Sequence, residues 1–512
     1  MADTKREIER KYESGESGLP DLTGVAGVAT VLGKGVAELD AVYYDTLDER
    51  LAAASITLRR RTGGKDAGWH LKFPVSPGVR DEIRAPLSDT LPDSLAGLVR
   101  SRVREAELIP LVRLLSTRDV SELLDADGTF LAELSVDAVV AERLTDGGRT
   151  AQWSEIEVEL ADDGDPAFLE KIDKKLRKAG VRPSQSPSKL ARALQETAPK
   201  KSGKKDKQRG KGEGGGEVPG KPVTPGEHVL AYVRVQRDAI VALDPAVRRD
   251  VFDSVHGMRV ATRRLRSTFK SFRKVLDRAV TDPIGVELKW LAGELGVDRD
   301  QEVLTERLTE ALDDLPESLV TGPVRTRLRT WSQKDGGTGP RPELIDALDG
   351  QRYLELLESL DAVLTDPPLL KAAGGDPEKV ITKAVKKDFA KVATLVEEAL
   401  AQPSGADRDL AMHEARKKAK RTRYAAEAGR PLLGKPAKEV VRGMKSLQRL
   451  LGDHQDSVMA REFLRHIAFQ AHEAGESAFT YGLLYGREER RAELAEGALP
   501  ETWATISDDL PF

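Results

Sequence analysis

The second half of the chain carries one basic pattern twice, and this repetition constrains the fold more than any other feature. Each copy begins with a histidine and has basic residues three, seven and ten positions later. The two sets, which we name the first and the second stripe, are His256, Arg259, Arg263 and Arg266, and His413, Arg416, Lys420 and Arg423. Because an α-helix turns by roughly 100° per residue, each set spans an arc of only about 80° on a helix. We therefore expect two helices, each with one basic face.

The repetition extends beyond the stripes. A second motif, L-G-x-x-x-D, begins at Leu295 after the first stripe and at Leu451 after the second. Apolar residues such as Leu265 and Phe269 lie on the other face of the first stripe's helix, so the helix can pack and still present its bases. An internal duplication of helical segments predicts a domain of two related halves. We expect residues 226–512 to form an all-α domain of two duplicated helical-bundle halves.

The stripes concentrate positive charge without compensation. No Asp or Glu occurs between His256 and Arg273, whereas a solvated helix usually mixes acids with its bases. A single run of bases is usually a solvated face, but two copies with the same offsets favour a functional surface. Two such helices facing each other would form a trough for a polyanion. Nucleic acid fits this trough less well, because the stripes lack interleaved aromatic residues that stack on bases.

The histidines are better suited to phosphate than to metal. No compact ligand spacing such as H-E-x-x-H surrounds His256, His413 or His454. A histidine at the end of a basic stripe can instead hydrogen-bond a phosphate. The aspartates of the second motif either orient the arginines in bidentate pairs or form buried structural ion pairs. These aspartates are Asp298, Asp300, Asp453 and Asp456.

The stripe sequences, H-x-M-R-V-A-x-R-R-L-R and H-x-x-R-x-x-x-K-x-x-R-Y, each followed by L-G-x-x-x-D, resemble the CHAD family of conserved-histidine α-helical domains. The resemblance runs from Pro225 to the C-terminus. Domains of this kind bind inorganic polyphosphate, so the resemblance supplies the polyanion. The residues that it assigns to polyphosphate are His256, Arg259, Arg263, Arg266, Lys270, His413, Arg416, Lys420, Arg423 and His454.

The N-terminal segment has strand patterns of reversed polarity, with charged residues sharing one face of each strand. Glu7, Glu9 and Lys11 share a face of the first strand, because strand side chains alternate. Bases dominate the middle strands and acids the first and the late ones. A sheet with one wet face explains any single strand. A closed barrel explains the mixture of signs, because its interior would hold a phosphate chain together with divalent cations.

Several motifs in this segment resemble, together and in order, the CYTH family of triphosphate tunnel metalloenzymes over residues 3–195. They are E-x-E-x-K at 7–11, L-R-R-R at 58–61, L-K-F-P at 71–74, E-I-E-V-E at 155–159 and S-K at 188–189. By this resemblance the fold is α+β, an antiparallel eight-stranded β-barrel tunnel with flanking helices. The implied chemistry is in-line attack of water on a terminal phosphorus, assisted by Mg²⁺ or Mn²⁺.

The same resemblance assigns the residues of the tunnel. Those expected to bind phosphate are Lys11, Arg59, Arg61, Lys72, Arg84, Arg118 and Lys189. Those expected to hold the metal are Glu7, Glu9, Asp137, Glu155, Glu157 and Glu159. The expected catalytic residues are Glu9, Lys11, Glu155 and Glu157. Because the strands of Arg84 and Arg118 have weak patterns, Arg80 and Arg113 are alternatives for their roles.

Composition sets the remaining limits. The net charge is −4, so an anion site depends on local clustering, and the absence of cysteine excludes disulfides and thiolate metal sites. Without an apolar signal segment or a run of ~18 apolar residues, we expect a soluble cytoplasmic protein, with no membrane partner and with polyphosphate granules as a candidate location. Residues 197–225, rich in glycine, proline and lysine, predict a flexible linker between domains at 1–196 and 226–512.

These patterns predict a two-domain phosphohydrolase. We expect metal-dependent hydrolysis of inorganic triphosphate, or of short polyphosphate ends, in the tunnel, while the helical domain binds polyphosphate. The linker would keep the tunnel at high local concentration near polymer ends. An ordinary nucleotide triphosphatase is disfavoured, because the chain has no P-loop. Two alternatives remain: a non-catalytic protein that targets polyphosphate, and an adenylate cyclase, since some members of the tunnel family are cyclases.

Overall fold

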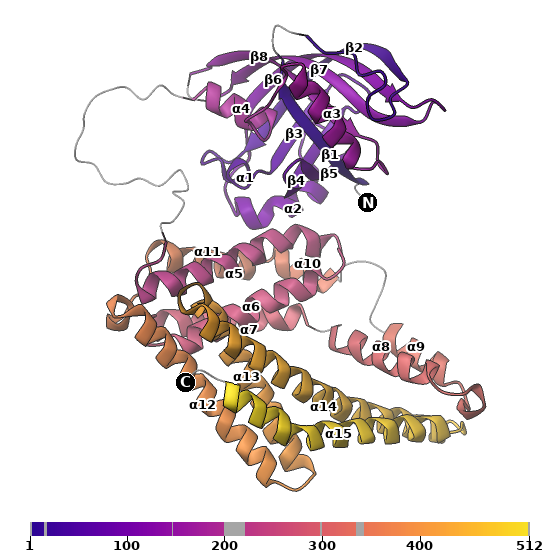
Figure 1. Ribbon diagram of the computed structural model, residues 1–512, viewed down its shortest axis with the longest axis vertical. Coiled ribbons are helices and arrows are strands. Elements are labelled where there is room, and N and C mark those ends of the chain that lie inside the picture. The colour runs from indigo at the N-terminus through magenta and orange to yellow at the C-terminus, as the bar shows by residue number, and fades with distance from the viewer. Residues whose placement is uncertain are drawn as a thin grey trace. The chain divides into compact units, whose positions relative to one another are not determined.

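The computed structural model describes residues 3–14, 18–145, 147–198, 221–296, 299–333 and 342–509 (Figure 1). The chain divides into two compact units, Met1–Gly215 and Gly216–Phe512. Most of the expected linker, residues 199–220, lies outside the described residues. The linker and the exact domain boundaries therefore stay predictions.

The first unit is a closed antiparallel β-barrel. Its sheet has the order β5-β4-β3-β2-β6-β7-β8-β1-β9, and β1 also pairs with β5, which closes the barrel. The eight long strands, which confirm the expected count, are β1 (Asp3–Glu13), β2 (Thr30–Asp45), β3 (Thr57–Thr62), β4 (Gly68–Ser76), β5 (Val79–Ala85), β6 (Ile109–Leu124), β7 (Phe130–Arg143) and β8 (Thr150–Leu160). The two-residue strand β9 (Arg182–Pro183) adds to the edge of β1.

The apolar faces of the strands point outward and are covered by helices. Leu71 of β4 and Leu95 of α2 belong to one buried cluster, and Val158 of β8 and Ile172 of α3 belong to another. Each fully buried aliphatic side chain contributes about 1.5–3 kcal/mol to stability. Since the outer faces take up the apolar residues, the charged residues between them face inward. The helices of this unit are α1 (Arg50–Ala53), α2 (Asp93–Val103), α3 (Ala167–Lys178) and α4 (Lys189–Glu196).

The second unit is all-helical, as expected. Its longer helices are α5 (Pro225–Arg248), α6 (Ser254–Ser271), α7 (Arg278–Glu294), α8 (Arg299–Asp313), α9 (Val324–Gln333), α10 (Pro342–Asp349), α11 (Gln351–Thr365), α12 (Pro377–Ala401), α13 (Ala406–Leu433), α14 (Lys435–Glu473) and α15 (Phe479–Asp509). Short 3₁₀ turns occur at Glu317–Leu319 and Lys371–Gly374. In the described parts of the chain, no helix combines the length and the apolar character needed to cross a bilayer.

The duplication seen in the sequence recurs in the helices. The first stripe lies on α6 and the second on α13, and these two helices contact each other. Both contribute to one core, in which Leu265 of α6 and Ala419 of α13 are fully buried. The two copies therefore share a core, because the faces opposite both stripes are apolar. A second core lies between α8, α9 and the paired helices α14 and α15 (Figure 1).

Candidate functional site

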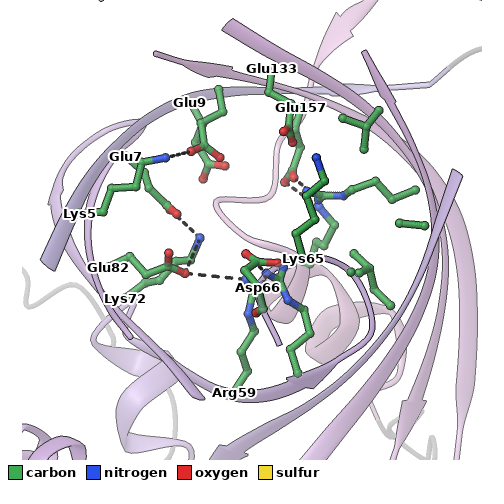
Figure 2. Close-up of a pocket in the computed structure, with 18 of the residues that line it drawn as sticks. Lys5, Glu7, Glu9, Arg59, Lys65, Asp66, Lys72, Glu82, Glu133 and Glu157 are labelled. Carbon is green, nitrogen blue, oxygen red and sulfur yellow. Dashed lines mark hydrogen bonds and ion pairs between the residues drawn. The ribbon is translucent and has the colours of Figure 1, made fainter. Parts of the chain in front are cut away.

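The inner faces of the barrel strands enclose a cavity of about 500 Å³. Most of the residues that line it are charged, and Figure 2 shows several of them pointing into the barrel. The cations that line it are Lys5, Lys11, Lys34, Arg59, Arg61, Lys65, Lys72, Arg80, Arg84, Arg118 and Lys189. The carboxylates that line it are Glu7, Glu9, Asp66, Glu82, Glu122, Glu133, Glu157 and Glu159. Every phosphate-binding residue expected from the sequence therefore reaches one cavity.

Strands β3, β4 and β5 form a wall of cations held by one buried carboxylate. Glu82 of β5 is fully buried, and its oxygens accept from Lys72 Nζ at 3.3 Å and Arg84 Nε at 2.5 Å. His70 Nδ1 lies 2.8 Å from the same carboxylate. Burial acts to raise the pKa of Glu82, but the hydrogen bond from His70 and the charges of Lys72 and Arg59 outweigh it and hold that pKa far below its usual range. Glu82 thus fixes the positions of the cations.

Glu7 is the carboxyl of β1 that faces this wall. It is 3% exposed and accepts a hydrogen bond from Lys72 Nζ at 2.5 Å, with Arg84 Nη2 at 3.8 Å. Burial raises the pKa of Glu7 to about 7, against the opposing charge of Lys72. A carboxyl in this range exchanges a proton near neutral pH.

The opposite wall comes from β1, β6, β7, β8 and α4. Lys11 Nζ lies 3.0 Å from Glu9 and also pairs with Glu157. Arg118 donates to Glu157 at 2.8 Å. Lys189 Nζ, at the start of α4, lies 2.6 Å from Glu157 as well. Burial opposes ionisation of Glu157, but Lys11, Lys189 and Arg118 outweigh it and hold its pKa well below the usual range. Glu157 is therefore the carboxylate around which this wall is organised.

Asp137 and Glu155 lie behind the cavity surface, since neither lines the cavity. Asp137 accepts two hydrogen bonds from Arg118, at 2.7 and 2.8 Å. Lys189 Nζ lies 3.0 Å from Asp137 and 2.6 Å from Glu155. The oxygens of Asp137, Glu155 and Glu157 approach within 4.8 Å of one another, but a lysine and an arginine already bind them. Asp137, Glu155 and Glu157 therefore form a group that could hold a metal ion, as expected, and in this structure Lys189 and Arg118 pair with its oxygens.

A divalent cation fits the carboxylates that do face the cavity. Glu9 of β1 lies opposite Glu159 of β8 in the strand register, and Glu159 lies opposite Glu133 of β7. Burial raises the pKa of Glu133, partly against the charge of Arg118. Oxygen ligands of this kind are those that Mg²⁺ and Mn²⁺ prefer. Glu9, Glu157 and Glu159 thus offer oxygen ligands on the cavity side, and Glu157 also belongs to the group with Asp137 and Glu155.

The structure separates one of the two pairs of alternative arginines. Arg118 lines the cavity, whereas Arg113 pairs with Asp40 at 2.6 Å and lines no part of it. Arg84 and Arg80 both line the cavity; Arg84 pairs with Glu82, and Arg80 donates to the backbone oxygen of Pro187 at 3.1 Å.

Sequence reasoning left several lining residues out of the site. Glu133 and Glu82 share the inward face of strands that the sequence had identified, so alternation carried a signal for both. Lys65 and Asp66 come from the loop between β3 and β4, where no strand alternation indicates which side chains point inward.

In the helical unit, the two stripes meet at Lys420. Arg416 and Arg423 from its own helix and Arg263 from α6 all act on its ammonium group, and Asp456 of α14 is the opposing carboxylate. Burial and the three guanidinium groups lower the pKa of Lys420 to about 7. The proximity of Arg263 and Lys420 shows that the stripes lie side by side, as the expected trough requires.

The glycines of the two L-G-x-x-x-D motifs make the duplication visible in three dimensions. A Cβ atom on Gly296 would lie 2.8 Å from Arg259 Cζ, and one on Gly452 would lie 3.2 Å from Arg416 Nη2. The first arginine of each stripe therefore packs against the glycine of its own motif. Burial raises the pKa of Asp456, next to Arg416. Asp298 lies outside the described residues, as does the side chain of Asp300.

Other stripe residues differ in their surroundings. His413 Nδ1 lies 2.6 Å from Gln455 Oε1, which fixes its ring, and His256 is half-buried. Burial lowers the pKa of Arg266, and burial together with the Arg266 charge lowers that of Lys270. Arg423 lies 3.5 Å from Glu427, a carboxylate in the second copy at the position that corresponds to Lys270.

His454 is wrongly placed among the phosphate ligands. It is 1% exposed, and its Nε2 lies 3.2 Å from Asp409 and 3.4 Å from Glu496. The ring is buried, and the two carboxylates beside it would repel a polyanion. Gln455, the next residue of α14, contacts His413, whereas the ring of His454 points to Asp409 of α13 and Glu496 of α15.

Comparison with known proteins agrees with both halves of this geometry. A family model described as CYTH domain matches residues 5–194, and one described as CHAD domain matches residues 231–465. The chain is also 40% identical over 507 residues to the uncharacterized proteins Rv2226 and MT2285 of two Mycobacterium tuberculosis strains, covering 96% of this chain and 93% of each relative. This chain is a CYTH–CHAD protein. CYTH enzymes depend on a metal, and the family includes triphosphatases and cyclases.

Solved structures similar to parts of the CYTH–CHAD protein have lower identity. PptA from Streptomyces chartreusis is 20% identical, with a TM-score of 0.45, covering 55% of this chain and 99% of that one. The CHAD domain from the plant Ricinus communis is 24% identical, with a TM-score of 0.43, covering 56% and 92%. The putative adenylyl cyclase HpAC1 from Hippeastrum, described as having a dominant triphosphatase activity, is 17% identical, with a TM-score of 0.24, covering 39% and 98%.

Proposed function

We propose that the barrel hydrolyses inorganic triphosphate, or the end of a short polyphosphate, with Mg²⁺ or Mn²⁺, and that the helical unit binds inorganic polyphosphate. The observation that supports the first part is the division of one cavity into two walls. Arginines and lysines of β3–β5 face carboxylates of β1 and β8 across about 500 Å³. Cations suit phosphate oxygens, and carboxylates suit a divalent cation that bridges phosphates.

The residues of the cavity divide the work of hydrolysis. Arg59, Arg61, Lys72 and Arg84 bind and orient the phosphate oxygens and stabilise the charge that gathers on them. Bound at Glu9, Glu157 and Glu159, the divalent cation would neutralise phosphate charge and polarise the P–O bond. Attack of water on the terminal phosphorus breaks the bridging P–O bond and gives phosphate and pyrophosphate.

The proton released by the attacking water needs an acceptor in the cavity. Glu9, whose carboxylate lies 3.0 Å from Lys11 Nζ, is suited to orient that water. Burial acts to raise the pKa of Glu9, but Lys11 outweighs it and the pKa lies below its usual value, so Glu9 stays ionised at neutral pH. Glu7, with a pKa of about 7, can hold the proton.

The basis for polyphosphate binding is the pair of stripes on α6 and α13. Among the described residues, Nε of Arg266 and Nε of Arg416 are buried without a hydrogen-bond acceptor. A buried guanidinium nitrogen without an acceptor is costly, and a phosphate oxygen would supply one. The low pKa of Lys420 has the same origin, since an excess of positive charge surrounds it.

One set of assays tests this function. Phosphate release from inorganic triphosphate, ATP and long-chain polyphosphate is measured side by side, with Mg²⁺ and with Mn²⁺, for the natural chain, Glu9→Gln and Glu107→Gln. We expect triphosphate to be the best substrate, with a loss of about a hundredfold or more in Glu9→Gln. Glu107 is exposed and lies outside the cavity, so Glu107→Gln controls for the chemical change.

The other outcomes point to the two alternatives. Cyclic AMP from ATP, in place of phosphate from triphosphate, would identify a cyclase. No turnover of any of the three, with binding of long-chain polyphosphate retained, would identify a binding protein. Equal rates in the natural chain and Glu9→Gln would contradict the role of the cavity.

A further inference from the structure

The loop between β3 and β4 enters the barrel. It comprises residues 63–67, and Lys65 and Asp66 line the cavity, where Figure 2 shows both inside the ring of strands. Asp66 adds a carboxylate on the side of the cavity where the residues of β3, β4 and β5 are mostly cations. Two glycines, His70 and Arg61 hold the loop in this position, and the Asp66 side chain contacts arginines of the cavity wall.

Glycines at both ends of the loop allow this conformation. Gly63 has a φ of 79°, and a Cβ on it would lie 2.1 Å from the backbone oxygen of Glu38. Gly68 has a φ of 158°, and a Cβ on it would lie 2.5 Å from the backbone oxygen of Ala85. No other residue type fits at either position without moving the neighbouring strand backbone. The loop is therefore built to pack closely on the strands.

His70 of β4 holds the loop in place through a hydrogen bond to its backbone. The ring is 1% exposed; its Nε2 lies 2.9 Å from the backbone oxygen of Asp66, and its Nδ1 lies 2.8 Å from Glu82. Arg61 Nη2 donates to the same backbone oxygen at 3.4 Å. The backbone of Asp66 is thus tied to the residues that hold the cation wall in place.

The carboxylate of Asp66 binds phosphate-binding arginines directly. It pairs with Arg61, and it lies 4.0 Å from Arg84 Nη2. Burial opposes ionisation of Asp66, but the charges of Arg61, His70 and Arg59 outweigh it, so its pKa is lowered and the group is ionised at neutral pH. An internal anion therefore holds the position that Arg61 and Arg84 would otherwise offer to a phosphate group.

Asp66 and Lys189 lie at opposite ends of the cavity. Arg84, beside Asp66, lies opposite Asp3 at the start of β1 in the strand register. Glu155, which binds Lys189, lies opposite Glu13 at the end of β1. The phosphate-binding cations between these ends form the part of the cavity that has no loop carboxylate in it.

We propose that Asp66 sets the length of the phosphate chain that the barrel accepts. A short chain such as triphosphate fits between Lys189 and Arg59 and leaves the Asp66–Arg61 pair intact. A longer chain brings another phosphate to Arg61 and Arg84, where it meets the Asp66 carboxylate. The added phosphate and the Asp66 carboxylate are both negatively charged and repel each other. Chains longer than triphosphate therefore bind less well. This inference rests on the proposed function, because it assigns the chain length used by the same cavity.

Two measurements on the full chain test the inference. The first is kcat/KM for inorganic tetraphosphate relative to inorganic triphosphate. Asp66→Asn removes the charge and keeps the shape, and we expect it to raise this ratio about tenfold or more. Asp66→Glu keeps the charge and should keep the ratio of the natural chain. Asp89→Asn is the matched control, because Asp89 is fully exposed, pairs with Arg60 and lies outside the cavity.

The second measurement does not depend on turnover. Calorimetric titration of the metal-free chain with triphosphate and with tetraphosphate compares the two affinities in the natural protein and in Asp66→Asn. The helical unit is the same in both variants, so its contribution cancels. An unchanged ratio of affinities, or an equal loss for both ligands because Arg61 has lost its support, would overturn the proposal. If no variant hydrolyses either substrate, the proposed function fails, and this titration still decides the role of Asp66.

Discussion

Lys420 gives the sharpest prediction about the helical unit, because its charge changes near neutral pH. Its ammonium group lies among Arg416, Arg423 and Arg263, with Asp456 as the opposing carboxylate, and burial with these charges lowers its pKa to about 7. A polyphosphate chain laid along the stripes would neutralise the guanidinium groups and favour the protonated lysine. Binding should therefore take up a proton when the pH lies above 7.

The size and sign of the effect follow from the pKa. Below pH 7 Lys420 is mostly protonated already, so it should add little to any pH dependence of the affinity for polyphosphate. Above pH 7 the protein must first be protonated, and each further pH unit should lower the affinity by up to about tenfold, or 1.36 kcal/mol. Between pH 6 and pH 8 we expect a loss of about tenfold.

The assay is fluorescence anisotropy of end-labelled long-chain polyphosphate, at pH 6, 7 and 8 and constant ionic strength. Lys420→Arg keeps a permanent charge, so its affinity should be nearly independent of pH. Lys417→Arg is the matched control, because Lys417 lies on the same helix but is exposed and pairs with Glu414 at 2.5 Å. The same pH dependence in the natural chain and in Lys420→Arg would refute the reasoning, since the titrating group would then be another one.

Three further predictions concern other parts of the molecule. Glu82→Gln leaves the cations of β4 and β5 without their buried partner and should lower the free energy of unfolding by roughly 3–5 kcal/mol; a loss below about 1 kcal/mol in urea unfolding, the range of an exposed pair, would contradict this. Gly452→Ala places a Cβ 3.2 Å from Arg416 Nη2, so this guanidinium has to shift and polyphosphate binding should weaken; unchanged binding would show that the ligand does not depend on the present position of the guanidinium. Arg259→Ala combined with Arg416→Ala should flatten the decrease of polyphosphate affinity with salt by a slope of about 0.7–0.9 per lost phosphate contact; a parallel salt dependence would remove the stripes from the binding surface.

Alternation along strands was enough to predict the tunnel wall. Arg59, Lys72 and Glu9 face the cavity because charged residues at every second position cannot all be covered by helices on the outside. The two-residue alternation predicts which face of the sheet a side chain is on, but not whether other side chains separate it from the cavity. Asp137 and Glu155 share the inward face, but Lys189 from α4 binds both, so they lie outside the cavity surface. Their separation from the cavity depends on the position of α4, which the alternation within β7 and β8 does not predict.

The repeated sequence predicted the neighbouring stripes but not every member of them. Offsets on a helix fix the face, so Arg263 and Lys420 were identified correctly as neighbours in one surface. His454 was included among the phosphate-binding histidines, yet α13 and α15 each give it a carboxylate partner, Asp409 and Glu496. Asp66 had no periodic signal at all, since its position depends on the backbone angles of two glycines.

The closure of the barrel through β1 has a consequence for how the protein folds. The first strand pairs with β5 but also with β8, whose residues follow it by more than 140 positions. Contacts between such distant segments form late, because a long loop of chain must be ordered first. During synthesis the charged face of β1 therefore remains hydrated until β8 has left the ribosome. The costly removal of water from the interior charges is then postponed to the last step, when all of their partners are present.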